Sequence, residues 1–117
     1  MEKPYDLRLR TKLFSLETLN LIEGLPQSRT FSIIHNQLGR AALSVGTNYR
    51  VVSRAKSNRD FINKLKIVEE ELDECLFFLE LLKEKSELDK EMIQQVWNEG
   101  NELLSIVVAS IIKARKK

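Results

Sequence analysis

Apolar residues recur at intervals of three and four over long stretches of the chain, which is the spacing of one face of an α-helix. Proline occurs only at Pro4 and Pro26, so no proline interrupts helices in the rest of the sequence. The most regular stretch has its apolar positions at Phe61, Leu65, Val68, Leu72, Cys75 or Leu76, Leu79 and Leu82. This pattern predicts an all-α protein.

Start and stop signals divide the chain into four helices. The first ends at Gly24, which can cap it, and Pro26 prevents its continuation. The third opens at Ser57, followed three residues later by Asp60 as in a capping box. The expected helices cover residues 6–23, 28–55, 58–84 and 89–114. Short connections make neighbouring helices antiparallel, so we predict an up-down-up-down four-helix bundle that forms one domain over residues 1–117.

The second helix admits another interpretation. Ala42, Gly46 and Val52 have the spacing of the small residue, turn glycine and packed apolar residue of a DNA-binding helix-turn-helix. That motif requires the apolar stripe to break at Gly46, whereas the stripe that begins at Phe31 keeps its phase as far as Val52. We therefore favour one continuous helix, in which Gly46 allows close approach of another helix and costs about 1 kcal/mol of helix propensity.

The fourth helix starts after Ser86 or Asp89 and is apolar over much more than one face. The residues expected to face the core are Ile93, Trp97, Gly100, Leu104, Val107 and Ile111. Its apolar residues nevertheless cover about 240° of the helix, against the ~100° that a single core needs. Because such a surface favours association, we predict a homo-oligomer. The candidate interface residues are Gly39, Gly46, Phe77, Leu81, Ile106, Val108 and Ile112.

Charge is balanced overall, with 19 Lys and Arg against 17 Asp and Glu, but it is unevenly distributed. No Asp or Glu lies between Gly24 and Arg59. On the second helix, Arg40, Arg50 and Arg54 share one face, spread over roughly 20 Å at ~1.5 Å per residue. A basic face of this kind can bind successive phosphates of RNA or DNA with little sequence preference. The candidate nucleic-acid-binding residues are Arg40, Arg50, Arg54, Lys56, Arg59 and Lys64.

The basic face has an alternative partner. The third helix carries an acidic stripe, which could pair with the basic face within one chain or between subunits. The stripe consists of Glu69, Asp73, Glu80 and Glu84. In that case the protein would be a docking scaffold for an acidic protein, and nucleic acid would not be its ligand. The sequence leaves both possibilities open.

The residue inventory disfavours catalysis. The single histidine, His35, cannot complete a di-metal bundle site, which needs two Glu-x-x-His motifs. His35 borders the apolar stripe of the second helix, so we expect a hydrogen-bonded residue at the edge of the core. Cys75 lies on a core face without a cationic neighbour, as expected of a buried thiol. We expect no enzyme activity, no metal and no cofactor.

Several features predict a soluble cytoplasmic protein. The single cysteine cannot form an internal disulfide, and the amino terminus lacks the apolar core of a signal peptide. The longest apolar run, residues 103–112, is too short to span a bilayer. We therefore expect no membrane partner.

The order of short motifs along the chain resembles one family, the bacterial four-helix-bundle proteins encoded by intervening sequences of 23S ribosomal RNA genes, also called S23-type proteins. The matching motifs are YDLRLRTKLF, GLP, SVGTNYR, RAKS, FINKL and EEELDECLFFLELL. Two positions depart from the family pattern: Val51 replaces an acidic residue, and Phe78 replaces a Trp in the last motif.

The resemblance implies a left-handed antiparallel bundle that assembles into a ring, a pentamer, without established enzymatic activity. The related accessory proteins of diversity-generating retroelements, which are similar in fold, bind nucleic acid together with a reverse transcriptase. This likeness adds RNA or DNA, and a protein partner, to the expectations from the residues.

Overall fold

The computed structural model of the chain describes residues 6–85 and 90–117. It contains helices α1 (Leu7–Glu23), α2 (Arg29–Arg50), α3 (Asn58–Lys85) and α4 (Lys90–Arg115), with the short 3-10 helix η1 (Val52–Arg54) between α2 and α3. No strand occurs in the described ranges. The predicted all-α fold of four helices is confirmed. The expected start signals of the fourth helix, Ser86 and Asp89, lie outside the described residues.

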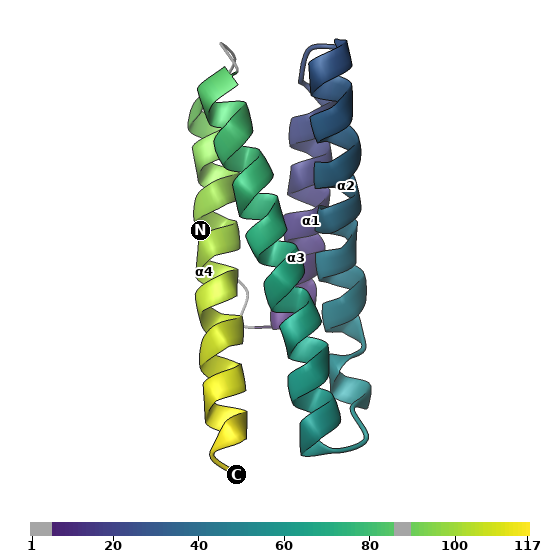
Figure 1. Cartoon of the computed structure of the whole chain (residues 1–117), viewed down its shortest axis with the longest axis vertical. Coiled ribbons are helices and arrows are strands. Elements are labelled where there is room, and N and C mark those ends of the chain that lie inside the picture. The colour runs from purple at the N-terminus through teal and green to yellow at the C-terminus, as the bar shows by residue number, and fades with distance from the viewer. Residues whose placement is uncertain (1–5, 86–89) are drawn as a thin grey trace.

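The four helices pack side by side, each against the next along the chain, and α4 also contacts α1 (Figure 1). The colour gradient in Figure 1 shows that each helix runs against the direction of the one before it, which is consistent with an up-down-up-down order. No close backbone contacts join α1 to α3, so these two helices lie on a diagonal of the bundle. Left-handedness stays a prediction.

Side-chain caps begin three of the helices. Asp6 accepts a hydrogen bond from the Arg8 amide at 2.9 Å, and Ser28 accepts one from the amide of Phe31 at 3.1 Å. At α3 the Ser57 hydroxyl accepts from the Asp60 amide at 3.0 Å, as the capping-box pattern predicts. Asp60 in turn accepts from the backbone N–H of Lys56, one residue before the usual partner, at 3.0 Å.

The second helix is shorter than the sequence pattern predicts. We expected it to continue to residue 55, but α2 ends at Arg50 and η1 follows. The backbone N–H groups of Arg54 and Ala55 bond three residues back, to the carbonyls of Val51 and Val52. This tighter winding turns the side chain of Val52 into the core, where it is buried.

Gly46 lies inside the regular part of α2, with no break in the helix at that position. A helix-turn-helix needs a turn there, so the structure excludes that interpretation. Gly46 instead allows α1 to approach, because a β-carbon at this position would lie 2.7 Å from the Ser15 hydroxyl oxygen. Gly39 also faces α1, with Ile22 as its nearest side chain.

The core is one cluster of buried side chains to which all four helices contribute. The apolar positions predicted for the third helix are buried, except that Phe61 is only partly so. In α4 four of the six residues predicted to face the core are buried, namely Ile93, Gly100, Val107 and Ile111, whereas Val96 and Leu103 are buried where we expected Trp97 and Leu104. The Trp97 ring stays at the edge, where its N–H donates to the Glu80 carboxylate at 2.9 Å.

Helix α1 buries several polar side chains beside Phe14 and Leu21. Thr11, Ser15 and Thr18 are buried, and their hydroxyls donate to backbone carbonyls, Ser15 across to Ala42 of α2. Arg10 is also buried, and its guanidinium donates to both carboxylate oxygens of Glu99 in α4, at 2.7 and 2.8 Å. A second carboxylate, that of Glu102, lies 2.9 Å from the same guanidinium.

The opposite face of α1 carries leucines. Leu9, Leu13 and Leu16 follow the spacing of one helical face and are 44%, 37% and 52% exposed. The helix therefore has an apolar surface that no other part of the described chain covers.

Candidate nucleic-acid interface

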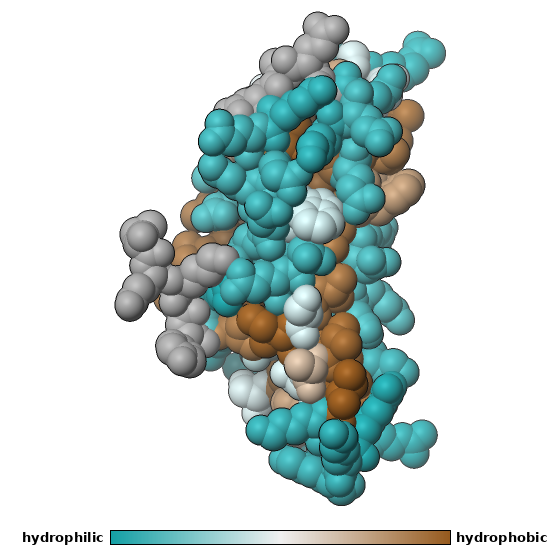
Figure 2. All heavy atoms as spheres, turned by 90° about the vertical axis from the view of Figure 1, so that its left-hand side faces the viewer, coloured by the Kyte–Doolittle hydropathy of each residue, from teal (hydrophilic) through white to brown (hydrophobic). Residues whose placement is uncertain are grey.

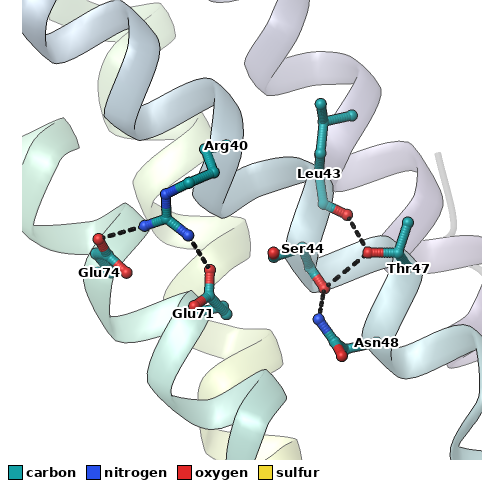
Figure 3. A network of polar contacts seen from close by, with 7 residues as sticks. All are labelled: Arg40, Leu43, Ser44, Thr47, Asn48, Glu71 and Glu74. Atoms are coloured by element: carbon teal, nitrogen blue, oxygen red, sulfur yellow. Dashed lines mark hydrogen bonds and ion pairs between the residues drawn. The ribbon is translucent and has the colours of Figure 1, made fainter.

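Arg40, the first candidate phosphate ligand, is engaged within the chain. Its guanidinium donates to Glu74 at 2.6 Å and to Glu71 at 3.2 Å, both on α3 (Figure 3). The hydrogen bond to Glu74, together with that carboxylate's charge, raises the pKa of Arg40. We expected any acidic partner to come from the stripe that includes Glu69 and Asp73. The partners instead come from the adjacent side of α3, the side that faces α2.

The face of α2 between Arg40 and Arg50 offers few free polar groups. The Thr47 hydroxyl and the Asn48 amide donate to carbonyls of their own helix, those of Leu43 and Ser44 (Figure 3). The predicted continuous row of arginines along α2 is therefore interrupted. Arg40 is held in ion pairs with α3, and the polar side chains of Thr47 and Asn48 bond to carbonyls of their own helix.

The remaining basic candidates gather at one end of the bundle. Arg50 ends α2, Arg54 belongs to η1, Lys56 lies in the following loop and Arg59 in the first turn of α3. All four side chains are exposed. Unlike Arg40, they make no ion pair with any residue in the described ranges.

The carboxyl terminus of α4 joins the same end. The side-chain amide of Asn58, at the start of α3, donates to the Ala114 carbonyl at 2.8 Å. This bond brings the four basic residues at the carboxyl terminus close to Arg54 and Arg59. We call the combined surface the basic end; it consists of Arg50, Arg54, Lys56, Arg59, Lys113, Arg115, Lys116 and Lys117.

Acidic groups are scarce around the basic end. In residues 50–66 and 103–117 the sequence has one carboxylate, Asp60. Its oxygens lie 2.9 Å from the Lys64 ammonium, so the candidate Lys64 is already paired. The hydrogen bond from the Lys56 amide, reinforced by Lys64, lowers the pKa of Asp60.

A groove between α1 and α2 extends the positive surface upward from Arg50. It has a volume of about 530 Å³. Its lining residues include three cations and two leucines, namely Arg8, Lys12, Arg50, Leu9 and Leu43, together with one carboxylate, Asp6. Arg8 and Lys12 are not among the predicted binding residues, although their i, i+4 spacing and the lack of Asp and Glu in residues 7–16 indicate a basic face.

The candidate oligomer residues fall into three places. Phe77 and Leu81 are exposed on α3, at 55% and 36%. On α4, Ile112 is exposed while Ile106 and Val108 are half-buried. Figure 2 shows hydrophobic atoms gathered in a band on the lower part of the side where α4 lies. The third place, Gly39 and Gly46, is the α1–α2 contact inside one chain. Their assignment to an oligomer interface stays a prediction.

The two residues considered for chemistry lie away from these surfaces. Cys75 is fully buried, and burial raises the pKa of its thiol to about 12, so the thiol stays protonated at neutral pH. His35 is half-buried beside Phe31, but its buried Nε2 atom lacks the hydrogen bond we expected. No group of three His, Cys, Asp or Glu residues in the described ranges could hold a metal ion.

Within the same ranges, no helix combines the length and the apolarity that crossing a bilayer requires. The fold and the surface together define the class of protein: an all-α four-helix bundle with a strongly basic end.

Comparison with known proteins narrows this class. The model of the family described as 23S rRNA-intervening sequence protein matches residues 6–109, so the chain belongs to that family. A crystal structure of a protein of unknown function, from the S23 ribosomal protein family of Bacteroides thetaiotaomicron, superposes with a TM-score of 0.82. The two sequences are 27% identical, and the alignment covers 91% of this chain and 98% of that chain. No curated protein sequence matches significantly. The predicted family is confirmed.

Proposed function

We propose that this protein is a non-enzymatic, self-associating bundle of the cytoplasm that binds the phosphate backbone of structured RNA or DNA through its basic end. One observation carries the proposal. Exposed Lys and Arg side chains from α2, η1, the loop, α3 and α4 converge at one end, where Asp60 is the one carboxylate within residues 50–66 and 103–117 and is already paired.

The basic end favours the backbone over the bases. Its charged groups come from three helix ends and a loop, and within residues 6–85 and 90–117 no exposed aromatic ring lies among them on which a base could stack. Neutralising about five phosphates would release counterions and give a slope of roughly −4.5 in log affinity against log salt for duplex DNA. Affinity would then fall by roughly two to three orders of magnitude between about 50 and 200 mM salt.

Salt-dependent binding to a labelled structured RNA and a matched DNA duplex tests this proposal. The test variant is Arg54→Glu, Arg59→Glu, Arg115→Glu, which reverses three charges of the basic end. The control is Arg29→Glu, Lys85→Glu, Lys90→Glu, which changes the total charge equally at exposed positions of the opposite end. Circular dichroism and light scattering establish that fold and oligomeric state match the parent.

We expect the parent and the control to bind with a steep salt slope, and the test variant to lose at least ~10-fold in affinity with a flatter slope. Equal losses in both variants would mean that only total charge matters, which would overturn the assignment of the basic end. A parent that fails to bind at low salt would remove nucleic acid as the ligand.

A docking scaffold for an acidic protein is the second candidate. The pairing of Arg40 with Glu71 and Glu74 supports it, because basic and acidic faces of this chain already match each other in one place. A parent that ignores RNA and DNA, while its basic-end variant loses a protein partner, would favour this function. The ring-shaped pentamer that the family resemblance implies is compatible with either function.

A further inference from the structure

Two exposed surfaces of the bundle combine apolar side chains with charges of one sign. The first lies on α1 and the adjoining edge of α2; we call it the basic leucine surface, and it consists of Arg8, Leu9, Lys12, Leu13, Leu16, Leu43 and Arg50. The second lies on α3; we call it the acidic phenylalanine surface, and it consists of Glu70, Asp73, Phe77, Leu81 and Glu84. Every one of these residues is exposed.

The two surfaces differ in the sign of most of their charges, although Asp6 also lines the groove of the first and Lys85 follows Glu84 in the second. Residues 7–16 contain no Asp or Glu, and residues 67–82 contain no Lys or Arg. Each surface would therefore repel a second copy of itself and attract the other. A symmetric contact, in which the same surface meets itself, is disfavoured for both.

The two surfaces cannot meet within one chain. Helices α1 and α3 lie on a diagonal of the bundle, and each turns its buried residues toward the common core (Figure 1). Leu13 and Phe77, which lie opposite the buried residues of their helices, therefore point out of opposite sides of the molecule. Only a second copy can bring the two surfaces together.

The shapes also correspond. The groove between α1 and α2, with a volume of about 530 Å³, has Leu9 and Leu43 on its walls and Gly46 among its lining residues. On the other surface, Phe77 projects with 55% of its area exposed, and its ring is braced edge-on by Phe78 at a centroid distance of 5.6 Å. A projecting aromatic side chain is the usual anchor in a recessed apolar site.

We infer that the basic leucine surface of one copy docks on the acidic phenylalanine surface of the next. Phe77 of one copy enters the α1–α2 groove of the other, while Arg8, Lys12 and Arg50 face Asp73 and Glu84 across the contact. The inference rests on the self-association proposed above and names its two sides. Such a head-to-tail contact repeats from copy to copy, so it closes into a ring or continues as a filament.

Complementary charge reversals test the inference. One variant, Arg8→Glu, Lys12→Glu, makes the basic leucine surface negative, and the other, Asp73→Lys, Glu84→Lys, makes the acidic phenylalanine surface positive. All four side chains are exposed and make no ion pair among the described residues, so each variant retains the fold, which circular dichroism checks. The control is Arg29→Glu, Lys113→Glu, which changes two exposed charges at the start of α2 and the end of α4, outside both surfaces.

Size-exclusion chromatography with light scattering gives the readout. We expect the parent and the control to associate, and each reversal variant alone to associate at least ~10-fold more weakly, because both of its surfaces then carry the same sign. Mixing the two variants should restore association, since every surface again finds one of opposite charge. Mixed assemblies of the two variants should alternate.

Two results would overturn the inference. If either reversal variant keeps the mass of the parent, the contact lies elsewhere, and self-association itself still stands. If the parent is a monomer at every concentration, the proposed self-association fails and the inference fails with it. Binding of nucleic acid is tested separately, with the variant of Arg54, Arg59 and Arg115, none of which belongs to either docking surface.

Discussion

Helices α1 and α3 face each other across the core, yet they are built in opposite ways. The inner face of α3, a helix of 28 residues, is apolar from Leu65 to Leu82, and its outer face carries carboxylates around the exposed Phe77 and Leu81. Helix α1 has 17 residues, buries Arg10 and three hydroxyl side chains, and exposes three leucines. Burial of apolar area therefore holds α3, whereas α1 combines the burial of Phe14 and Leu21 with polar bonds and close backbone approach.

The difference shows how one bundle combines a stable apolar core with a fixed rotation of α1. Apolar burial is non-directional and contributes about 25 cal/mol per Å² removed from water, so α3 can anchor the core on its own side chains. Hydrogen bonds and ion pairs contribute less to net stability but demand one geometry. The contacts of Arg10 and Ser15 thus fix the rotation of α1, which decides that its leucines face outward.

The largest effect should come from the inner face of α3. Leu72→Ala removes a fully buried side chain and should lower the free energy of unfolding by about 3 kcal/mol, measured by urea denaturation. Leu16→Ala on the outer face of α1 is the control and should change it by less than about 1 kcal/mol. Similar losses in both variants would contradict the contrast between the two helices.

The buried ion pair of α1 comes next. Arg10→Ala leaves the Glu99 carboxylate without its bidentate partner and should cost about 2–3 kcal/mol, which is below the range for fully buried pairs because Glu99 keeps some contact with water. Arg40→Ala removes an exposed arginine with two carboxylate partners and should cost less than about 1 kcal/mol. If the order were reversed, polar contacts would not be what holds α1.

The two glycines of α2 test the close approach of α1. A methyl group at Gly46 would lie 2.7 Å from the Ser15 oxygen, so Gly46→Ala should lose roughly 1 kcal/mol despite its better helix propensity. At Gly39 the nearest atom is 3.6 Å away, and Gly39→Ala should gain up to about 1 kcal/mol. Thermal denaturation of both variants, alongside Gly46→Ala combined with Ser15→Ala, separates steric from propensity effects. Equal shifts at both glycines would refute the steric argument.

The smallest effect concerns acid pH. The pKa of Asp60 is lowered by the Lys56 amide and by Lys64, so this carboxylate stabilises the fold above its unfolded-state pKa. That contribution is lost as the pH falls through the lowered folded-state pKa, below about pH 4. Asp60→Asn should therefore show less dependence of stability on pH in this range, measured by denaturation at several acid pH values. A variant with the same dependence as the parent would show that other carboxylates account for it.

The contrast between the two helices also explains what the sequence could predict. Helix α3 follows the apolar period without exception, so its inner face was readable from Leu65 to Leu82. In α1 the inward side mixes Phe14 and Leu21 with buried polar side chains, and periodicity alone does not separate these two from the outward leucines at 9, 13 and 16, which do not join the core. The polar contacts that decide the rotation of α1 come from residues 27 to 92 positions away along the chain, as for Ser15 with Ala42 and Arg10 with Glu102.

The candidate site was predictable in composition but not in arrangement. The absence of acids between Gly24 and Arg59 identified the positive charge correctly. The sequence could not show that Arg40 reaches α3, because that pairing depends on how two helices are rotated toward each other. Nor could it show that Asn58 brings the basic residues at the carboxyl terminus beside Arg59, since this depends on where α4 ends.

The burial of Cys75 has a practical consequence. Its protonated thiol lies in the middle of α3, out of reach of reagents in solution. A thiol reagent can modify it only when α3 separates from the core, so the rate of labelling reports the free energy of that opening under native conditions. The chain thus contains its own probe of local unfolding, and a second cysteine placed on the surface could be labelled selectively beside it.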